Sequence, residues 1–339
     1  SLFLENNRLS SIPEGVFVNC SVLSSLGFNQ NKIIEISENA FIGLSNLQRL
    51  DLGDNSIKSL PQNIFESTPK MSFLSLGNNE IEDLQPDLLK HLTSLSMLFV
   101  YGNRISILQE GIFKNNRELK EIALFKNQII EIEVEVFSDL SQLEVLELDN
   151  NLIEVFPSLE GLVNLKKLFL QINKIQKISL NVDLGNLEEL DLGRNSIKDI
   201  PAGTFSYLTK LRKLSLYSNQ LSKLSAGAFQ RLSYLQELDL SKNQLTNLNG
   251  NAFLTCTALE GINLRNNKIG TIEKNFFDYV PELSSLNLEG NVCVDQKFNA
   301  AEDISDDSLL KDCFSSAITT KFNIFLLFVL VSSVIKILK

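Results

Sequence analysis

The stretch Leu47-Gln-Arg-Leu-Asp-Leu-Gly-Asp-Asn-Ser-Ile57 carries a pattern that returns along nearly the whole chain. Aliphatic residues occupy its first, fourth, sixth and eleventh places, and asparagine occupies the ninth. The asparagine recurs thirteen times, at Asn7, Asn31, Asn55, Asn79, Asn103, Asn127, Asn151, Asn173, Asn195, Asn219, Asn243, Asn267 and Asn291. The intervals are 24 residues, except for two of 22 between Asn151 and Asn195. Such a fixed period indicates an array of stacked units.

Burial explains the residue types in this pattern. In Leu50-Asp51-Leu52 apolar and polar residues alternate, which predicts a short strand with its leucines on one face. Stacking removes these leucines from water, so the strands should pair as a parallel sheet about 60 Å long for thirteen strands. The asparagine amide both donates and accepts, and it should satisfy the backbone groups of the turn that follows each strand.

A second series of residues recurs with the same spacing as the asparagines. Phenylalanine stands ten residues after the asparagine at Phe17, Phe41, Phe65, Phe113, Phe137, Phe205, Phe229, Phe253 and Phe277. Leu89 replaces it once, and the two short repeats have Leu162 and Leu184 nearby instead. We expect these side chains to fill the convex side of the array as core, with a local change of curvature between residues 151 and 195.

The repeats resemble the extracellular class of the leucine-rich repeat family, including the ectodomains of Toll-like receptors and surface-anchored adhesion or immune proteins. This resemblance implies an α/β solenoid: a horseshoe with a parallel concave β-sheet, short irregular or 3-10 convex segments and a reduced carboxyl-terminal cap. It also implies a role in ligand recognition, cell adhesion or innate immunity. The alternative is a secreted or transmembrane repeat subunit that pairs with another receptor or immune protein.

The predicted organisation has four parts: a repeat array at 1–292, a disulfide cap at 293–313, a linker at 314–323 and a hydrophobic tail at 324–339. The chain begins inside a repeat, without the amino-terminal cap that an exposed end coil requires, which indicates a piece of a longer protein. The cysteines Cys293 and Cys313 follow the last repeat, where a bridge would close the end coil. The cysteines Cys20 and Cys256 lie ten repeat intervals apart, so we expect buried thiols instead of a bridge.

The end of the sequence predicts membrane attachment. Ser315-Ser-Ala is followed by a polar spacer and an apolar run from Ile324 to Ile335, which is the layout of a glycosylphosphatidylinositol signal, with Ser315 as the candidate attachment site. The competing interpretation is a transmembrane helix, but the run is short against the roughly 20 residues that a bilayer crossing needs. We therefore favour a lipid anchor on the extracellular face, with secretion as the alternative. Asn19 lies in the only glycosylation motif, Asn19-Cys-Ser.

The outward strand positions predict a partner-binding surface. Most carry small or charged residues, but the middle repeats carry an apolar group that we expect to bind a protein partner: Phe73, Met97, Phe99, Tyr101, Phe125, Val145, Phe169 and Ile172, with Tyr217 further along. A charged rim should surround it: Glu121, Lys126, Glu147, Asp149 and Lys167. The alternative is that these side chains only cover the sheet.

Other function classes fit the sequence poorly. His91 is the only histidine, which excludes imidazole triads and multi-histidine metal sites, so we predict no enzyme, no metal and no cofactor. The net charge of -10 leaves no basic stripe for phosphates, which predicts no nucleic-acid partner. We expect a protein ligand or co-receptor, with no oligomeric state implied.

Overall fold

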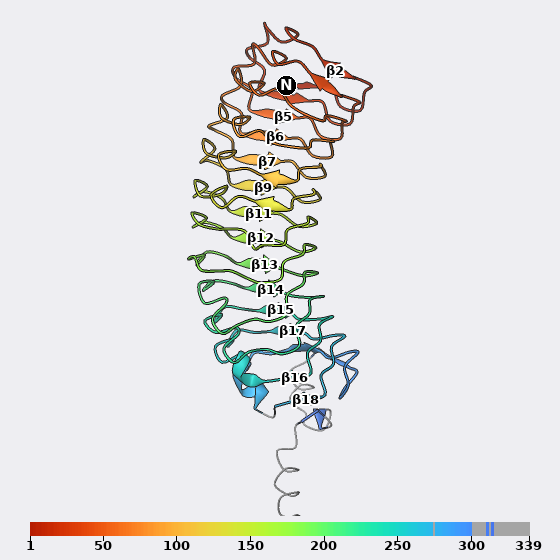
Figure 1. The fold of residues 1–339 in the computed structure, drawn as a ribbon, viewed down its shortest axis with the longest axis vertical. Helices are drawn as coiled ribbons and strands as arrows, with labels where there is room; N and C mark the ends of the chain where they lie inside the picture. Colours follow the sequence, from red (N-terminus) through yellow and green to blue (C-terminus); the bar gives the residue numbers. More distant parts are fainter. Residues whose placement is uncertain (274, 300–309, 312, 315–339) are drawn as a thin grey trace, which may run out of the picture.

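The molecule is a stack of coils arranged along one long axis, as Figure 1 shows. This computed structural model describes residues 1–273, 275–299, 310–311 and 313–314. Each coil starts at a strand of one large sheet, and we number the coils 1 to 13 in the order of their asparagines. Coils 7 (145–166) and 8 (167–188) are the two short ones, which follow from the 22-residue intervals.

The large sheet has fourteen strands, and all but the last run parallel in sequence order. Its parallel strands are β1 (Leu2–Phe3), β3 (Ser25–Gly27), β5 (Arg49–Asp51), β6 (Phe73–Ser75), β7 (Met97–Phe99), β9 (Glu121–Ala123), β11 (Val145–Glu147), β12 (Lys167–Phe169), β13 (Glu189–Asp191), β14 (Lys213–Ser215), β15 (Glu237–Asp239), β17 (Gly261–Asn263) and β19 (Ser285–Asn287). The antiparallel β20 (Lys297–Phe298) closes the carboxyl-terminal edge by pairing with β19. Thirteen parallel strands confirm the prediction. We call the outward side of this sheet the concave face.

The asparagine ladder joins each coil to the one before it. Asn79 is 7% exposed; its amide nitrogen donates to the carbonyls of Leu52 and Leu76, both at 3.0 Å, and its amide oxygen accepts from the Ile57 N–H at 3.0 Å. The same three bonds recur at the other inner asparagines, including Asn127 and Asn173. Since a buried unpaired backbone group costs about 1–3 kcal/mol, the ladder stabilises every turn after a strand.

The phenylalanine ladder lies in the core behind the sheet. Phe41 and Phe65 are fully buried and stack at 6.4 Å between ring centroids, and Phe205 and Phe229 repeat the arrangement at 6.2 Å. Leu89, Leu162 and Leu184 are also buried, as predicted.

The prediction was wrong at the last phenylalanine of this ladder. Phe276, not Phe277, is fully buried against Phe253, while Phe277 is half-buried. A 3-10 helix, η2 (Phe276–Tyr279), turns the chain one residue earlier there. A second 3-10 helix, η1 (Gly250–Ala252), lies in coil 11.

Three two-stranded parallel sheets lie on a second side of the coils, where the chain runs back after the asparagine turn. They are β2–β4 (Ser11–Ile12, Glu35–Ile36), β8–β10 (Ile107–Leu108, Glu131–Ile132) and β16–β18 (Asn247–Leu248, Thr271–Ile272). Figure 1 shows β2 displaced from the large sheet. We call this side the flank; the repeat pattern did not predict its sheets.

The carboxyl-terminal cap confirms the predicted bridge. Cys293 and Cys313 form a disulfide with their Cα atoms 4.9 Å apart. Phe314, placed by the prediction at the start of the linker, bridges to Ile272 instead and so extends the flank. The remaining linker, the candidate attachment site Ser315 and the hydrophobic tail lie outside the described residues.

Candidate functional site

The predicted binding residues divide into a compact group and scattered members. The compact group, which we call the aromatic cluster, comprises Phe73, Met97, Phe99, Tyr101 and Phe125, from β6, β7, β9 and the residues just after them. Phe73 and Phe99 meet edge to face at 5.3 Å, and Tyr101 stacks on Phe125 at 4.7 Å between ring centroids. Met97 is 40% exposed and the four rings are half-buried. The cluster therefore offers apolar surface to a partner.

The other predicted members do not join the cluster. Val145 is separated from Met97 by Glu121 in the strand register. Phe169 lies between Glu147 and Asp191. Each is an apolar side chain among charged neighbours.

Ile172 departs further from the prediction, which placed it on a strand. It lies after β12, in the turn, with a φ of 58°. The outward residues of β12 are Lys167 and Phe169, so the alternation continues at Gln171 and not at Ile172. The expectation that these side chains are all neighbours at outward strand positions was therefore wrong for Ile172.

Both tyrosines cover a glycine of the preceding coil. A Cβ on Gly77 would lie 2.5 Å from Tyr101, and one on Gly193 would overlap Tyr217 in the same way. The rings therefore shield backbone that would otherwise face water, and burial raises the pKa of both hydroxyls. Tyr217 lies far from the aromatic cluster and covers sheet surface, so its support for binding is weaker than that of Tyr101.

Cationic side chains edge the aromatic cluster. The Arg49 guanidinium carbon lies 3.5 Å from the centroid of the Phe73 ring, and the Lys126 ammonium lies 5.9 Å from that of Phe125. Both distances suit a cation–π contact. Lys167, predicted as rim, is further along the sheet and pairs with Glu189 at 3.4 Å.

Carboxylates follow the aromatic cluster along the concave face. Burial, then the charges of Asp149 and Glu121, raises the pKa of Glu147. Burial is also the first cause of the raised pKa of Asp149, which accepts from Asn150 at 2.8 Å, and of Asp191. Burial makes the charged form of each carboxylate less favourable, and a cationic partner would offset that cost.

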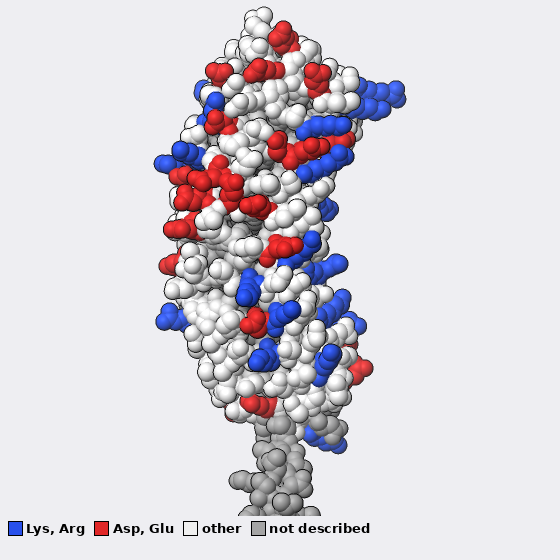
Figure 2. Space-filling view, viewed as in Figure 1, with Lys and Arg blue, Asp and Glu red and all other residues white. Residues whose placement is uncertain are grey.

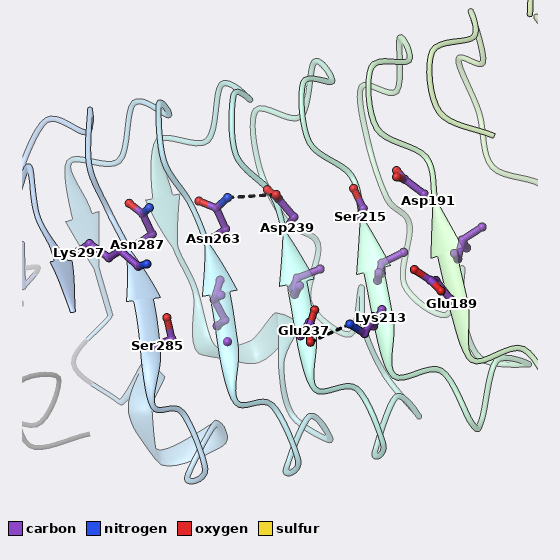
Figure 3. Close-up of a pocket in the computed structure, with 15 residues that line it drawn as sticks. Glu189, Asp191, Lys213, Ser215, Glu237, Asp239, Asn263, Ser285, Asn287 and Lys297 are labelled. Atoms are coloured by element: carbon purple, nitrogen blue, oxygen red, sulfur yellow. Dashed lines mark hydrogen bonds and ion pairs between the residues drawn. The ribbon is translucent and has the colours of Figure 1, made fainter. Parts of the chain in front are cut away.

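A polar hollow of about 430 Å³ occupies the concave face of the last strands, and Figure 3 shows its lining side chains. Lys213 pairs with Glu237 at 3.0 Å, and Asn263 donates to Asp239 at 3.0 Å. Gly261 leaves open space at the base of the hollow, because nothing lies within 4 Å of where its Cβ would be. Acidic and basic side chains alternate from strand to strand here. Most of them already have an ion-pair or hydrogen-bond partner within the protein.

The remaining predicted residues have these surroundings. Asn19 is exposed, as a glycan acceptor must be. Cys20 beside it is only half-buried, so the expected burial of this thiol was wrong at the first, less covered coil. Cys256 is fully buried, which raises the pKa of its thiol to about 12. In the described part of the chain, no helix has both the length and the apolar character for a membrane crossing.

The repeat pattern matches one family model, described as leucine rich repeat, over residues 1–57, 45–105, 117–175, 185–245 and 233–292. The chain belongs to the leucine-rich repeat family. A search of curated proteins found no match.

Solved structures resemble this leucine-rich repeat chain over most of its length. A leucine-rich repeat protein of Leptospira interrogans is 26% identical with a TM-score of 0.76, and the match covers 90% of this chain and 75% of that one. A chain of the Drosophila Toll–Spatzle complex is 25% identical with a TM-score of 0.75, over 82% of this chain and 38% of that one. An internalin of Listeria monocytogenes shares the fold at 24% identity and a TM-score of 0.67. Such repeat folds are typically protein-interaction scaffolds rather than enzymes, which supports a protein-binding role.

Proposed function

We propose that this leucine-rich repeat chain is an extracellular recognition module, held on the cell surface, that binds a protein ligand through the aromatic cluster. The observation that carries the proposal is the group of four rings and Met97 on an open sheet. Aromatic and methionine side chains are enriched at protein interfaces, where a few clustered residues supply most of the binding free energy. The neighbouring carboxylates would select a partner with a complementary charge.

The test of this surface is the double substitution Phe99→Ser with Phe125→Ser. We expect it to abolish capture of ligands from extracellular fluid by the immobilised protein, because one ring of each interacting pair is lost. The melting temperature should change little, since both rings are only half-buried. Val22→Ser, at a 90% exposed position in coil 1, is the matched control and should bind as the unchanged protein does. A large loss of stability with unchanged capture would show that the rings only cover the sheet.

The cell-surface part of the proposal rests on the sequence layout around Ser315. The chain is expressed in animal cells behind a signal peptide, and the cells are treated with phosphatidylinositol-specific phospholipase C. We expect release into the medium. Retention would favour a short membrane span, and appearance in the medium without the enzyme would favour the alternative of a secreted subunit.

A further inference from the structure

One of the three flank sheets, that of coils 5 and 6, ends where the short coils begin. Coil 5 pairs with coil 6 there through β8 and β10, and β10 is the last strand of its sheet. The N–H groups of Ile130 and Glu133 donate to Ser106 and Leu108 of coil 5. One coil later the pairing stops. After the bond from Leu152 to Ile129, no backbone N–H of residues 153–158 donates to coil 6. Pro157 has no N–H to donate, so it cannot act as a donor in this pairing.

This opening leaves a strand edge facing a groove. The carbonyls of Ile130 and Ile132 in coil 6 are at the repeat positions of the Ser106 and Leu108 carbonyls in coil 5. The coil 5 carbonyls accept hydrogen bonds from coil 6, whereas those of Ile130 and Ile132 accept none from coil 7. The flank groove has a volume of about 580 Å³ and is lined by residues 130–132, Val134, residues 154–158, Ser179 and Asn181. An unpaired strand edge beside a groove is a template for an added strand.

Apolar side chains surround this edge. Ile130, Val134 and Val155 are 56%, 74% and 80% exposed. Ile132, which corresponds to buried residues such as Leu108 in coil 5, is only half-buried. Phe156 forms a buried part of the groove lining. Contiguous exposed apolar residues from successive coils mark an interaction site more often than isolated ones do.

The charge around the groove identifies the chemistry of its occupant. Its charged lining residues are Glu131 and Glu154, and among the described residues no lysine or arginine lines it, although Lys174 pairs with Glu154 at 3.9 Å. Residues 110–160 contain twelve Asp and Glu but only four Lys and Arg, a net charge of -8 that the flank shares with the concave face. On the face shown in Figure 2, Asp and Glu atoms gather over the amino-terminal half, while Lys and Arg predominate below. A second copy docked by the same region would therefore be repelled.

We propose that the flank groove binds an extended segment of a partner protein in which apolar residues alternate with Lys or Arg. The segment adds a strand beside β10, and its N–H groups donate to the carbonyls of Ile130 and Ile132. One row of its side chains packs on Val134, Val155 and Phe156, and the other row meets Glu131 and Glu154. This surface is separate from the aromatic cluster, so it holds whether or not the concave face binds a ligand.

The test uses a fluorescent peptide in which valine alternates with lysine, and a second peptide with glutamate in place of lysine. We expect the first to bind the full chain at least tenfold more tightly than the second, measured by anisotropy. Val134→Ser with Val155→Ser should weaken it at least tenfold. The matched control, Val16→Ser with Val22→Ser, changes two exposed valines of coil 1 and should have no effect. All four positions are at least half exposed, so both variants should fold.

Backbone pairing provides a second measurement. A lysine–valine peptide with N-methylated amides along one edge should lose binding, because its N–H groups can no longer donate. Equal binding of the two charged peptides, equal loss in the control variant, or full binding of the methylated peptide would each overturn the proposal. A concentration-dependent dimer of the unchanged chain that Val134→Ser with Val155→Ser abolishes would overturn it as well, and would assign the groove to self-association.

Discussion

Coils 5 and 6 lie next to coils 7 and 8, and the same asparagine ladder joins all four. The two pairs differ in the side chains that fill their cores. Coils 5 and 6 contain Phe113 and Phe137, which stack at 6.1 Å, and they pair through a strand on the flank. Coils 7 and 8 are two residues shorter, have Leu162 and Leu184 in the core, and have no flank strand. Full-length coils such as 3, 4, 9 and 10 have no flank strand either, so the length of a coil changes its core filling but does not by itself decide the flank pairing.

The concave face of this part of the array also has a distinct feature. The carboxylates with raised pKa values, Glu147, Asp149 and Asp191, all come from coils 7 and 9. The same stretch of the array therefore combines an open flank with crowded charge on the sheet.

The largest expected effect is in the core. Phe229→Ala removes a fully buried ring that contacts Phe205 and Phe253, and it should lower the free energy of unfolding by about 3–5 kcal/mol. Leu184→Ala, in short coil 8, should cost about 2–3 kcal/mol because less volume is lost. Denaturant titration measures both. Equal losses would show that the short coils are packed as tightly as the long ones.

The asparagine ladder should not distinguish the two kinds of coil. Asn127→Ala and Asn173→Ala each remove the same three hydrogen bonds, besides a longer one from Asn127 to Phe125, and each should cost about 2–4 kcal/mol. Asn7→Ala is the control, because its side chain is exposed and bonds only within its own coil. A much smaller loss at Asn173 would mean that the short coils are joined by other contacts.

Hydrogen exchange should reveal the opening of the flank directly. The amides of Ile130 and Glu133 are bonded to coil 5, whereas those of Glu154 and Val155 have no backbone acceptor. We expect exchange at least tenfold faster at Glu154 and Val155, about 1.4 kcal/mol in opening free energy. Similar protection at all four amides would contradict the open edge.

The smallest expected effect concerns charge. The pKa of Glu147 is raised in the folded state, so the folded protein binds a proton there more tightly than the unfolded chain does. Well below the ordinary glutamate pKa of about 4.3 the group is neutral in both states; its cost grows as the pH rises above that value and is complete above the raised pKa. Glu147→Gln should therefore raise stability at pH 7 by less than about 1 kcal/mol, and not at pH 4.

Thermal melts at the two pH values measure this difference. The exposed Glu118→Gln serves as the control and should change stability at neither pH. A gain for Glu147→Gln that persists at low pH would point to a packing effect of the amide instead of charge.

Much of the array could be predicted because its determinants are local and repeated. The alternation around each asparagine defines thirteen strands, and the position of Cys293 and Cys313 after the last repeat predicts their bridge. The hydrogen bonds of the asparagine ladder follow from one side chain, whose amide nitrogen donates and whose amide oxygen accepts. No contact between distant parts of the sequence is needed for any of these features.

The other features depend on where the regular pattern is interrupted. Phe277 has the ten-residue spacing of the ladder, but the turn at η2 buries Phe276 in its place. The flank groove could have been found from the exposed alternation at residues 130–136 followed by Pro157 in a short coil. The site prediction overestimated the extent of the aromatic patch, because Ile172 is out of step with the alternation and charged residues separate Val145 and Phe169 from the cluster.

The disulfide between Cys293 and Cys313 has a mechanical consequence. If the chain is held by its carboxyl end, as the proposed anchor requires, tension passes from Cys313 across the bridge to Cys293 and bypasses the segment between them. The load then enters coil 13 beside Asn291, where the Cys293 N–H donates to Ile269 of coil 12 at 3.1 Å. Force on the tether is thus directed into the stacked array, while β20 keeps covering its last strand.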